Sequence, residues 1–214
     1  MKSNLVMVSI LFVASHSVAQ TGTVPVSLFN GKNLQGWTGY GGPASANWVA
    51  EGGVLSCTGA AGASWIHTEK EYGDFELSLE FNLPPDANSG VFIRAPKTGD
   101  PWVSGLEIQL LDDEGKKWKN LQPDQYSGSI YAVMAPSRRV TRQAGRWQSL
   151  KIRCVGKSCQ VWLNGQQVVD ADLKALALKA GEKVPGLRRA RGLVGLQNHG
   201  DRVSFRNIRI LEIR

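Results

Sequence analysis

The sequence predicts an all-β protein, a sandwich or barrel of short strands, and three observations point to this fold class. Short runs that alternate apolar and polar residues recur along the chain, and residues 75–81 (FELSLEF) alternate strictly, as a strand with one buried face does. Glycine-rich turns separate these runs. Helical periodicity is scarce, which argues against a fold of alternating strands and helices.

The first 19 residues predict a secretory signal peptide. Lys2 supplies the positive charge, residues 5–14 the apolar core, and residues 17–19 (SVA) a small-residue cleavage site before Gln20. The apolar run is too short to span a bilayer, and no cysteine follows the cleavage point to carry a lipid anchor. We therefore expect a periplasmic or secreted protein with no membrane span, whose residues 20–214 form one domain.

The mature chain offers a series of strands and one short helix. Asn164-Gly165 indicates a tight hairpin, because both residues tolerate the positive φ of a type I′ turn. Leucines at 173, 176 and 178 predict a helix over residues 173–179. Besides residues 75–81, strands are expected at residues 91–94, 106–111, 129–133, 150–155, 160–163, 167–169, 193–196 and 203–210.

The three cysteines allow at most one disulfide bond. Cys154 and Cys159 flank residues 155–158, and a two-residue turn at Gly156-Lys157 would place them opposite each other across a hairpin. Two alternatives remain open for this pair, a cross-strand Cys154–Cys159 disulfide or two free thiols in the core. Cys57 follows a strand-like Val-Leu-Ser run and is expected to be a buried apolar residue rather than a nucleophile.

The net charge of +7 is concentrated in the later part of the chain, at residues 138–151 and 179–191. Such a charge raises nucleic acid as a partner. The export signal, the lack of a nucleic-acid-binding motif and the scatter of these cations through loops with Gly and Pro argue against it. We expect solvated loops and no nucleic-acid partner.

A strand at residues 105–112 is the first stretch that suggests chemistry. Glu107 and Gln109 would project from one face of this strand, and the apolar residues between them from the other. A carboxylate and an amide together suit carbohydrate binding if the face is concave, whereas a solvated sheet is the alternative. Asp112 falls on the opposite face unless a bulge redirects it. Paired with Glu107, it would allow ordinary glycoside cleavage by a general acid and a base.

Residues around this strand add binding groups. Arg94 is expected to share a face with Phe92, where a guanidinium could hold hydroxyls or a carbonyl oxygen, or else form an ion pair with Glu107. Trp102 and Trp118 lie in the loops on either side of the strand, and we select Trp102 as the ring that stacks on a sugar.

His199 is the predicted proton carrier. It lies in an Asn-His-Gly turn between two strand-like runs, while His16 belongs to the signal peptide and His67 to a Trp-Ile-His-Thr run. A divalent metal ion stays an option, because several oxygen and nitrogen ligands are present, but no metal-binding motif is found and no ligand is assigned. Serine-hydrolase catalysis is not predicted, since the chain has no Gly-x-Ser-x-Gly elbow.

Ordered motifs cover essentially the whole mature chain. They are residues 27–34 (SLFNGKNL), 36–37 (GW), 72–77 (YGDFEL), 88–94 (NSGVFIR), 107–109 (EIQ), 128–131 (GSIY), 162–165 (WLNG), 195–200 (GLQNHG) and 205–208 (FRNI). In this order they resemble the 3-keto-disaccharide hydrolase family. The resemblance implies a concanavalin A-like jelly-roll sandwich of two antiparallel sheets, and an exported carbohydrate-active enzyme whose substrates are already oxidised at C3.

The resemblance also implies a mechanism. A ketone at C3 acidifies the C2 proton, so that a base removes it, the C1 substituent leaves, and water adds to the product. His199 or Glu107 is the implied base, and Tyr131 an acid or a sugar contact. The implied substrate-binding residues are Arg94, Gln109, Asn88, Gln197 and Trp102. A non-catalytic, lectin-like carbohydrate-binding domain on the same fold is the main alternative.

Overall fold

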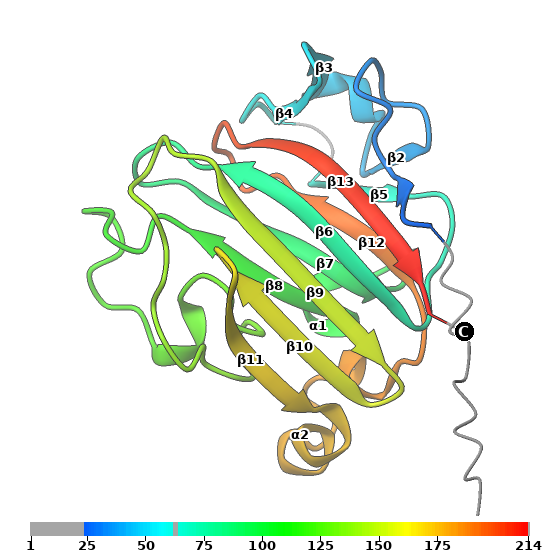
Figure 1. Cartoon of the computed structure of the whole chain (residues 1–214), viewed down its shortest axis with the longest axis vertical. Helices are drawn as coiled ribbons and strands as arrows, with labels where there is room; N and C mark the ends of the chain where they lie inside the picture. The colour runs from blue at the N-terminus through cyan, green and yellow to red at the C-terminus, as the bar shows by residue number, and fades with distance from the viewer. Residues whose placement is uncertain (1–23, 62–63, 214) are drawn as a thin grey trace, which may run out of the picture.

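The protein is an all-β sandwich of two antiparallel sheets packed face to face (Figure 1). This computed structural model describes residues 24–61 and 64–213, so the predicted signal peptide lies outside the described residues. The larger sheet has eight strands in the order β11-β10-β9-β6-β13-β4-β3, with β1 beside β13. The smaller sheet has five strands in the order β2-β5-β12-β7-β8 and lies behind the larger one in Figure 1.

The strand bounds agree with most of the predicted runs. The larger sheet contains β1 (Val26–Ser27), β3 (Trp48–Glu51), β4 (Val54–Cys57), β6 (Phe75–Asn82), β9 (Gln148–Val155), β10 (Ser158–Leu163), β11 (Gln166–Asp172) and β13 (Ser204–Glu212). The smaller sheet contains β2 (Trp37–Tyr40), β5 (Trp65–Thr68), β7 (Asn88–Ala95), β8 (Leu106–Leu111) and β12 (Leu193–Gln197). Strands β1, β2, β3 and β5 fall outside the predicted set, because runs of two to four residues are too short to show alternation.

Helices are few and short. The predicted helix is confirmed as α2 (Leu173–Ala180), which follows β11; the side chain of Asp172 caps it by accepting hydrogen bonds from the backbone N–H groups of Lys174 and Ala175. The other helices are α1 (Pro101–Ser104) and the 3₁₀ turns η1 (Ala44–Ala46), η2 (Pro123–Gln125) and η3 (Pro185–Arg188). None of the helices in the described segments is long and apolar enough to cross a membrane.

The core lies between the two sheets and follows the alternation of the strands. In β6 the residues at 75, 77, 79 and 81 are buried, while the residues between them are only partly covered. They belong to one apolar cluster with residues of the smaller sheet such as Ile66, Val91 and Ile108. Each fully buried side chain of this kind contributes roughly 1.5–3 kcal/mol. Burial of these residues fixes one face of the smaller sheet against the core. Because side chains alternate along a strand, it also determines which residues lie on the opposite face.

Residues 129–133 do not form the predicted strand. Ile130 makes isolated bridges to Ile108 and Met134, and the chain then turns back, with Ala132 in the left-handed region at φ 56°. The segment therefore pairs with β8 over only a few residues. It still brings Tyr131 alongside that strand.

Of the two alternatives for Cys154 and Cys159, the structure shows two free thiols. Cys154 and Cys159 face each other in the β9–β10 register, as the hairpin predicts, and both are buried. Their sulfurs are 3.4 Å apart, with the Cys154 thiol donating to Cys159, whereas a disulfide bond is about 2.05 Å long. Cys57 is also buried and free, and burial raises the pKa of its thiol, as expected for an unreactive residue.

Candidate functional site

The face of the smaller sheet that points away from the core gathers polar and aromatic side chains. Ile66, Val91, Ile108 and Leu196 point into the main core, so their strand neighbours point the other way. Trp65 and Phe92 accordingly form a separate apolar cluster with Ala95 and Leu193. We call this surface the site face; its residues are Trp65, His67, Asn88, Gly90, Phe92, Glu107, Gln109, Gly195 and Gln197.

Strand register arranges the site face in two rows. In the first row His67 lies opposite Gly195, Gly195 opposite Phe92, and Phe92 opposite Glu107. In the neighbouring row Trp65 lies opposite Gln197, and Gly90 lies opposite Gln109. Adjacent strands are about 4.8 Å apart, so the backbones of His67 and Glu107, at the two ends of the first row, are about 14 Å apart, and their side chains reach toward each other across the strands between them.

Two glycines let larger side chains lie flat on the sheet. A Cβ atom on Gly90 would come within 2.2 Å of Glu107 Oε1, and one on Gly195 within 2.4 Å of the Trp65 ring. The Glu107 carboxyl therefore lies across β7, and the Trp65 ring across β12. The Trp65 ring meets the Phe92 ring edge to face at 5.5 Å between centroids.

Glu107 has the most perturbed carboxyl on this face. Its side chain is 4% exposed, and burial raises its pKa to about 8, although a hydrogen bond with the Gln197 side chain opposes the rise. At neutral pH most of the carboxyl is therefore protonated. Such a group is suited to donating a proton rather than accepting one.

Several buried polar atoms of the site face have no protein hydrogen-bond partner. They are Asn88 Oδ1, Gln197 Oε1 and Trp65 Nε1. Buried polar groups are normally paired, and an unpaired one costs about 1–3 kcal/mol. Their occurrence together on the face that carries Glu107 fits a surface that binds a hydroxyl-rich ligand.

His67 is a site residue that the sequence prediction passed over. Its Nδ1 lies 2.9 Å from the carbonyl oxygen of Thr68, and because a carbonyl only accepts, Nδ1 carries the proton. In the neutral ring Nε2 then keeps a free lone pair, as a base requires. His67 and Trp65 are alternate residues of β5 and lie on the same face, with their ring centroids 4.8 Å apart.

His199 lies at the rim of the site face. It is exposed and follows the end of β12 by two residues. The backbone N–H of Asn198 donates to Ser64, its side chain donates to Ala60, and its Oδ1 accepts from Gly200, which together hold the turn. The predicted position in a turn between strands is therefore confirmed, while His67 occupies the row that contains Glu107.

Tyr131 and Trp102 lie next to the Glu107 end of this row. The backbone N–H of Tyr131 donates to the Glu107 carbonyl at 2.9 Å, and Gln125 Nε2 donates to the Tyr131 hydroxyl at 3.4 Å. The Trp102 ring on α1 meets the Tyr131 ring at 6.5 Å in an edge-to-face arrangement. The structure thus brings together two residues that were predicted separately.

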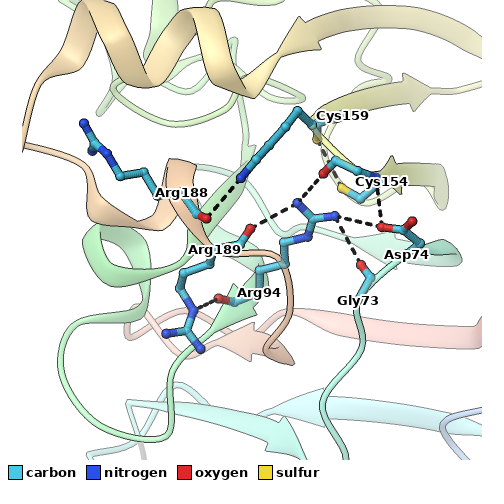
Figure 2. A network of polar contacts seen from close by, with 9 residues as sticks. Gly73, Asp74, Arg94, Cys154, Cys159, Arg188 and Arg189 are labelled. Atoms are coloured by element: carbon cyan, nitrogen blue, oxygen red, sulfur yellow. Dashed lines mark hydrogen bonds and ion pairs between the residues drawn. The ribbon is translucent and has the colours of Figure 1, made fainter.

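Arg94 is not on the site face, which corrects the prediction of a substrate contact. A register shift between β7 and β12 and a φ of 49° at Arg94 mark a bulge, and the bulge turns this side chain inward while Ala95 takes the outer position. The guanidinium is fully buried and donates to the carbonyls of Gly156, Arg189 and Gly73 (Figure 2). Its ion pair, at 3.4 Å, is with Asp74 rather than with Glu107.

The remaining predicted residues divide between the site face and the loops. Gln109 is buried on the site face, where its Oε1 accepts from the backbone of Leu110. Asp112 accepts a hydrogen bond from the backbone of Asp86, and Trp118 donates to the Asp86 carbonyl, so both hold a loop at the end of β8. Within residues 24–61 and 64–213, no three His, Cys, Asp or Glu side chains gather so as to hold a metal ion.

Comparisons with known proteins find related sequences. The sequence profile described as the 3-keto-alpha-glucoside-1,2-lyase-like domain matches residues 24–211. A Bacteroides thetaiotaomicron protein named 3-keto-disaccharide hydrolase is 26% identical over 224 residues, which cover 86% of this chain and 77% of that protein.

Solved structures show the same fold. A Parabacteroides distasonis protein described as a candidate glycosyl hydrolase superposes with a TM-score of 0.76 at 30% identity, covering 89% of this chain and all of that one. The carbohydrate binding module CBM66 of Bacillus subtilis has a TM-score of 0.54 at 17% identity, covering 84% of this chain and 98% of that one, and shows the fold alone. The concanavalin A-like jelly-roll sandwich implied by the motifs is confirmed.

Proposed function

This chain belongs to the 3-keto-alpha-glucoside-1,2-lyase-like domain family, and from that premise we propose that it cleaves the glycosidic bond of 3-keto-glycosides. The observation that carries the proposal is Glu107, a buried carboxyl with a pKa of about 8 that is hydrogen-bonded to Gln197, an amide whose oxygen has no protein partner. A protonated acid beside hydrogen-bonding groups is what the departure of a sugar substituent requires.

The proposed reaction is an elimination followed by hydration. The C3 ketone makes the C2 proton acidic, a base removes it, and the C1–O bond breaks with its electron pair moving to the leaving oxygen. Water then adds across the new C1–C2 double bond, so the net change equals hydrolysis. The base and the acid must act on neighbouring atoms of one sugar ring.

The site face suggests how the roles are divided. Glu107 donates its proton to the leaving oxygen, while His67 accepts the C2 proton through Nε2. The amides of Gln109, Gln197 and Asn88 hold the C3 oxygen and the sugar hydroxyls. Of the two bases implied by the sequence, Glu107 becomes the acid, and His199 becomes a residue of the rim.

Incubation with a 3-keto-glucoside and with its unoxidised parent, each with and without a chelator, tests this function. We expect aglycone release from the keto sugar alone, because only the ketone acidifies C2, and the chelator arm measures whether a divalent metal ion takes part. Binding of both sugars without turnover would favour a lectin-like domain. Cleavage of the parent sugar would favour an ordinary glycosidase that uses Glu107 and Asp112.

Two histidine substitutions identify the base. His67→Ala is expected to lower the rate of aglycone release by about a hundredfold or more, the usual contribution of a general base. His199→Ala is the matched control and is expected to lower it by less than about tenfold, as suits an exposed rim residue. Steady-state kinetics on the 3-keto-glucoside measures both, and the opposite ranking would assign the base to His199.

A further inference from the structure

Beyond the site face lies a pocket that none of the proposed catalytic steps uses. It has a volume of about 640 Å³ and is walled mainly by Trp102, Tyr131, Val133, Leu176, Leu178 and Val184. We call it the Trp102 pocket. Its walls come from α1, the segment after β8, and α2 with the loop that follows it.

The Trp102 pocket adjoins the proposed acid through Tyr131. The hydrogen bond of 2.9 Å from the Tyr131 backbone to the Glu107 carbonyl puts these residues side by side, one strand spacing apart. The Tyr131 ring is a wall of the pocket and packs against the Trp102 ring. The Glu107 carboxyl lies across β7, so a sugar held between this carboxyl and His67 would direct its C1 substituent over β8, toward Tyr131 and this pocket.

The lining of the pocket indicates the chemistry of its occupant. Two of the exposed large apolar residues among the described positions, Trp102 at 44% and Leu178 at 78%, line it. Exposed apolar surface concentrated in one hollow marks a binding site more often than scattered apolar residues do. The polar lining includes Lys179 and Lys183 against Asp124, so the balance of charge is positive.

From this placement we propose that the Trp102 pocket holds the aglycone, and that it is built for an aromatic, phenolic one. The inference rests on the proposed function. When the C1–O bond breaks, its electron pair passes to the phenolic oxygen, which takes the proton from Glu107. The released phenol then lies in the pocket against the Trp102 and Tyr131 rings, which accept aromatic rings in edge-to-face or offset packing.

Binding of inert sugars tests the pocket separately from catalysis. Phenyl and methyl glucosides, in both anomers, lack the C3 ketone and are not turned over in the proposed reaction. We expect the unaltered protein to bind the phenyl glucoside about tenfold more tightly than the methyl glucoside, and Trp102→Ala to abolish this preference. Trp162→Ala, on the outer surface of the larger sheet where Lys151 covers the ring, should leave the preference unchanged.

The same variants measured with the 3-keto forms complete the test. Trp102→Ala should lower the ratio of kcat/KM for phenyl over methyl 3-keto-glucoside by about tenfold. An equal loss for both substrates, or equal binding of the two inert glucosides by the unaltered protein, would overturn the proposal. Phenyl selectivity in binding without turnover of either keto sugar would refute the proposed reaction and leave the aromatic pocket in place.

Discussion

Replacing Glu107 with Gln is expected to slow aglycone release from a 3-keto-glycoside by about 10²- to 10⁴-fold, because the amide has no proton to give to the leaving oxygen. Gln keeps the shape of Glu107 and its contact with Gln197, so binding of the sugar should change little. Glu76→Gln, on the larger sheet, is the matched control and should retain full activity. A Glu107→Gln enzyme with the parent rate would remove Glu107 from the role of acid.

The pH dependence of stability gives an independent measure of the same carboxyl. The folded pKa of about 8 lies above the unfolded value near 4.3, so the folded state keeps its proton across this window while the unfolded state loses it. Stability from this group is present below about pH 4 and is lost as pH rises towards 8. The excess of the unfolding free energy of Glu107→Gln over that of the parent should therefore grow from about 1 kcal/mol at pH 5 to about 5 kcal/mol at pH 9.

Urea denaturation at pH 5 and pH 9 measures this difference. Parallel changes in the free energy of unfolding of the parent and of Glu107→Gln between these pH values would contradict a raised pKa. For activity, the parent rate should fall as pH rises through about 8, where the acid loses its proton.

Arg94→Met is expected to lower the free energy of unfolding by roughly 3–5 kcal/mol, the largest loss of stability predicted for this chain. The buried guanidinium is the donor to three backbone carbonyls and the partner of Asp74, and Met supplies none of these hydrogen bonds. The carbonyls of these three turn and loop residues would lose their buried hydrogen-bond donor. Chemical denaturation monitored by tryptophan fluorescence measures the change.

Two further variants make the Arg94 result interpretable. Arg191→Met removes a guanidinium that is 67% exposed and paired with Glu71, and should cost less than about 1 kcal/mol. Asp74→Asn neutralises the partner of Arg94 while its carbonyl contacts persist, and should fall between the two. A loss below about 1 kcal/mol for Arg94→Met would mean that water replaces the guanidinium and that its hydrogen-bond network contributes little.

Much of the fold could be predicted from the sequence because its signals are local. Strict alternation identified β6, and a leucine pattern identified α2. The same alternation placed Glu107 and Gln109 correctly on one face of β8, since the period of a strand fixes the direction of its side chains.

The misplacement of Arg94 and the omission of His67 have physical causes that lie outside the local pattern. Arg94 was assigned by counting alternate residues from Phe92, and a single bulge in β7, visible only from its pairing with β12, reverses the direction of that side chain. His67 lies in a strand of four residues, too short for periodicity to identify. Its proposed role as the base depends on the pairing of β5 with β12, which places it in one row with Gly195, Phe92 and Glu107.

Gly90 and Gly195 show that the surface of a flat sheet can make room for large side chains where residues lack a side chain of their own. A hollow on a sheet surface usually comes from long loops around it. Here the two glycines leave space on the sheet surface itself, and the Glu107 carboxyl and the Trp65 ring occupy that space. The geometry of the site thus depends partly on the absence of a Cβ atom at Gly90 and at Gly195. An engineer transferring this chemistry to another β-sandwich would have to transplant the empty positions together with the reactive side chains.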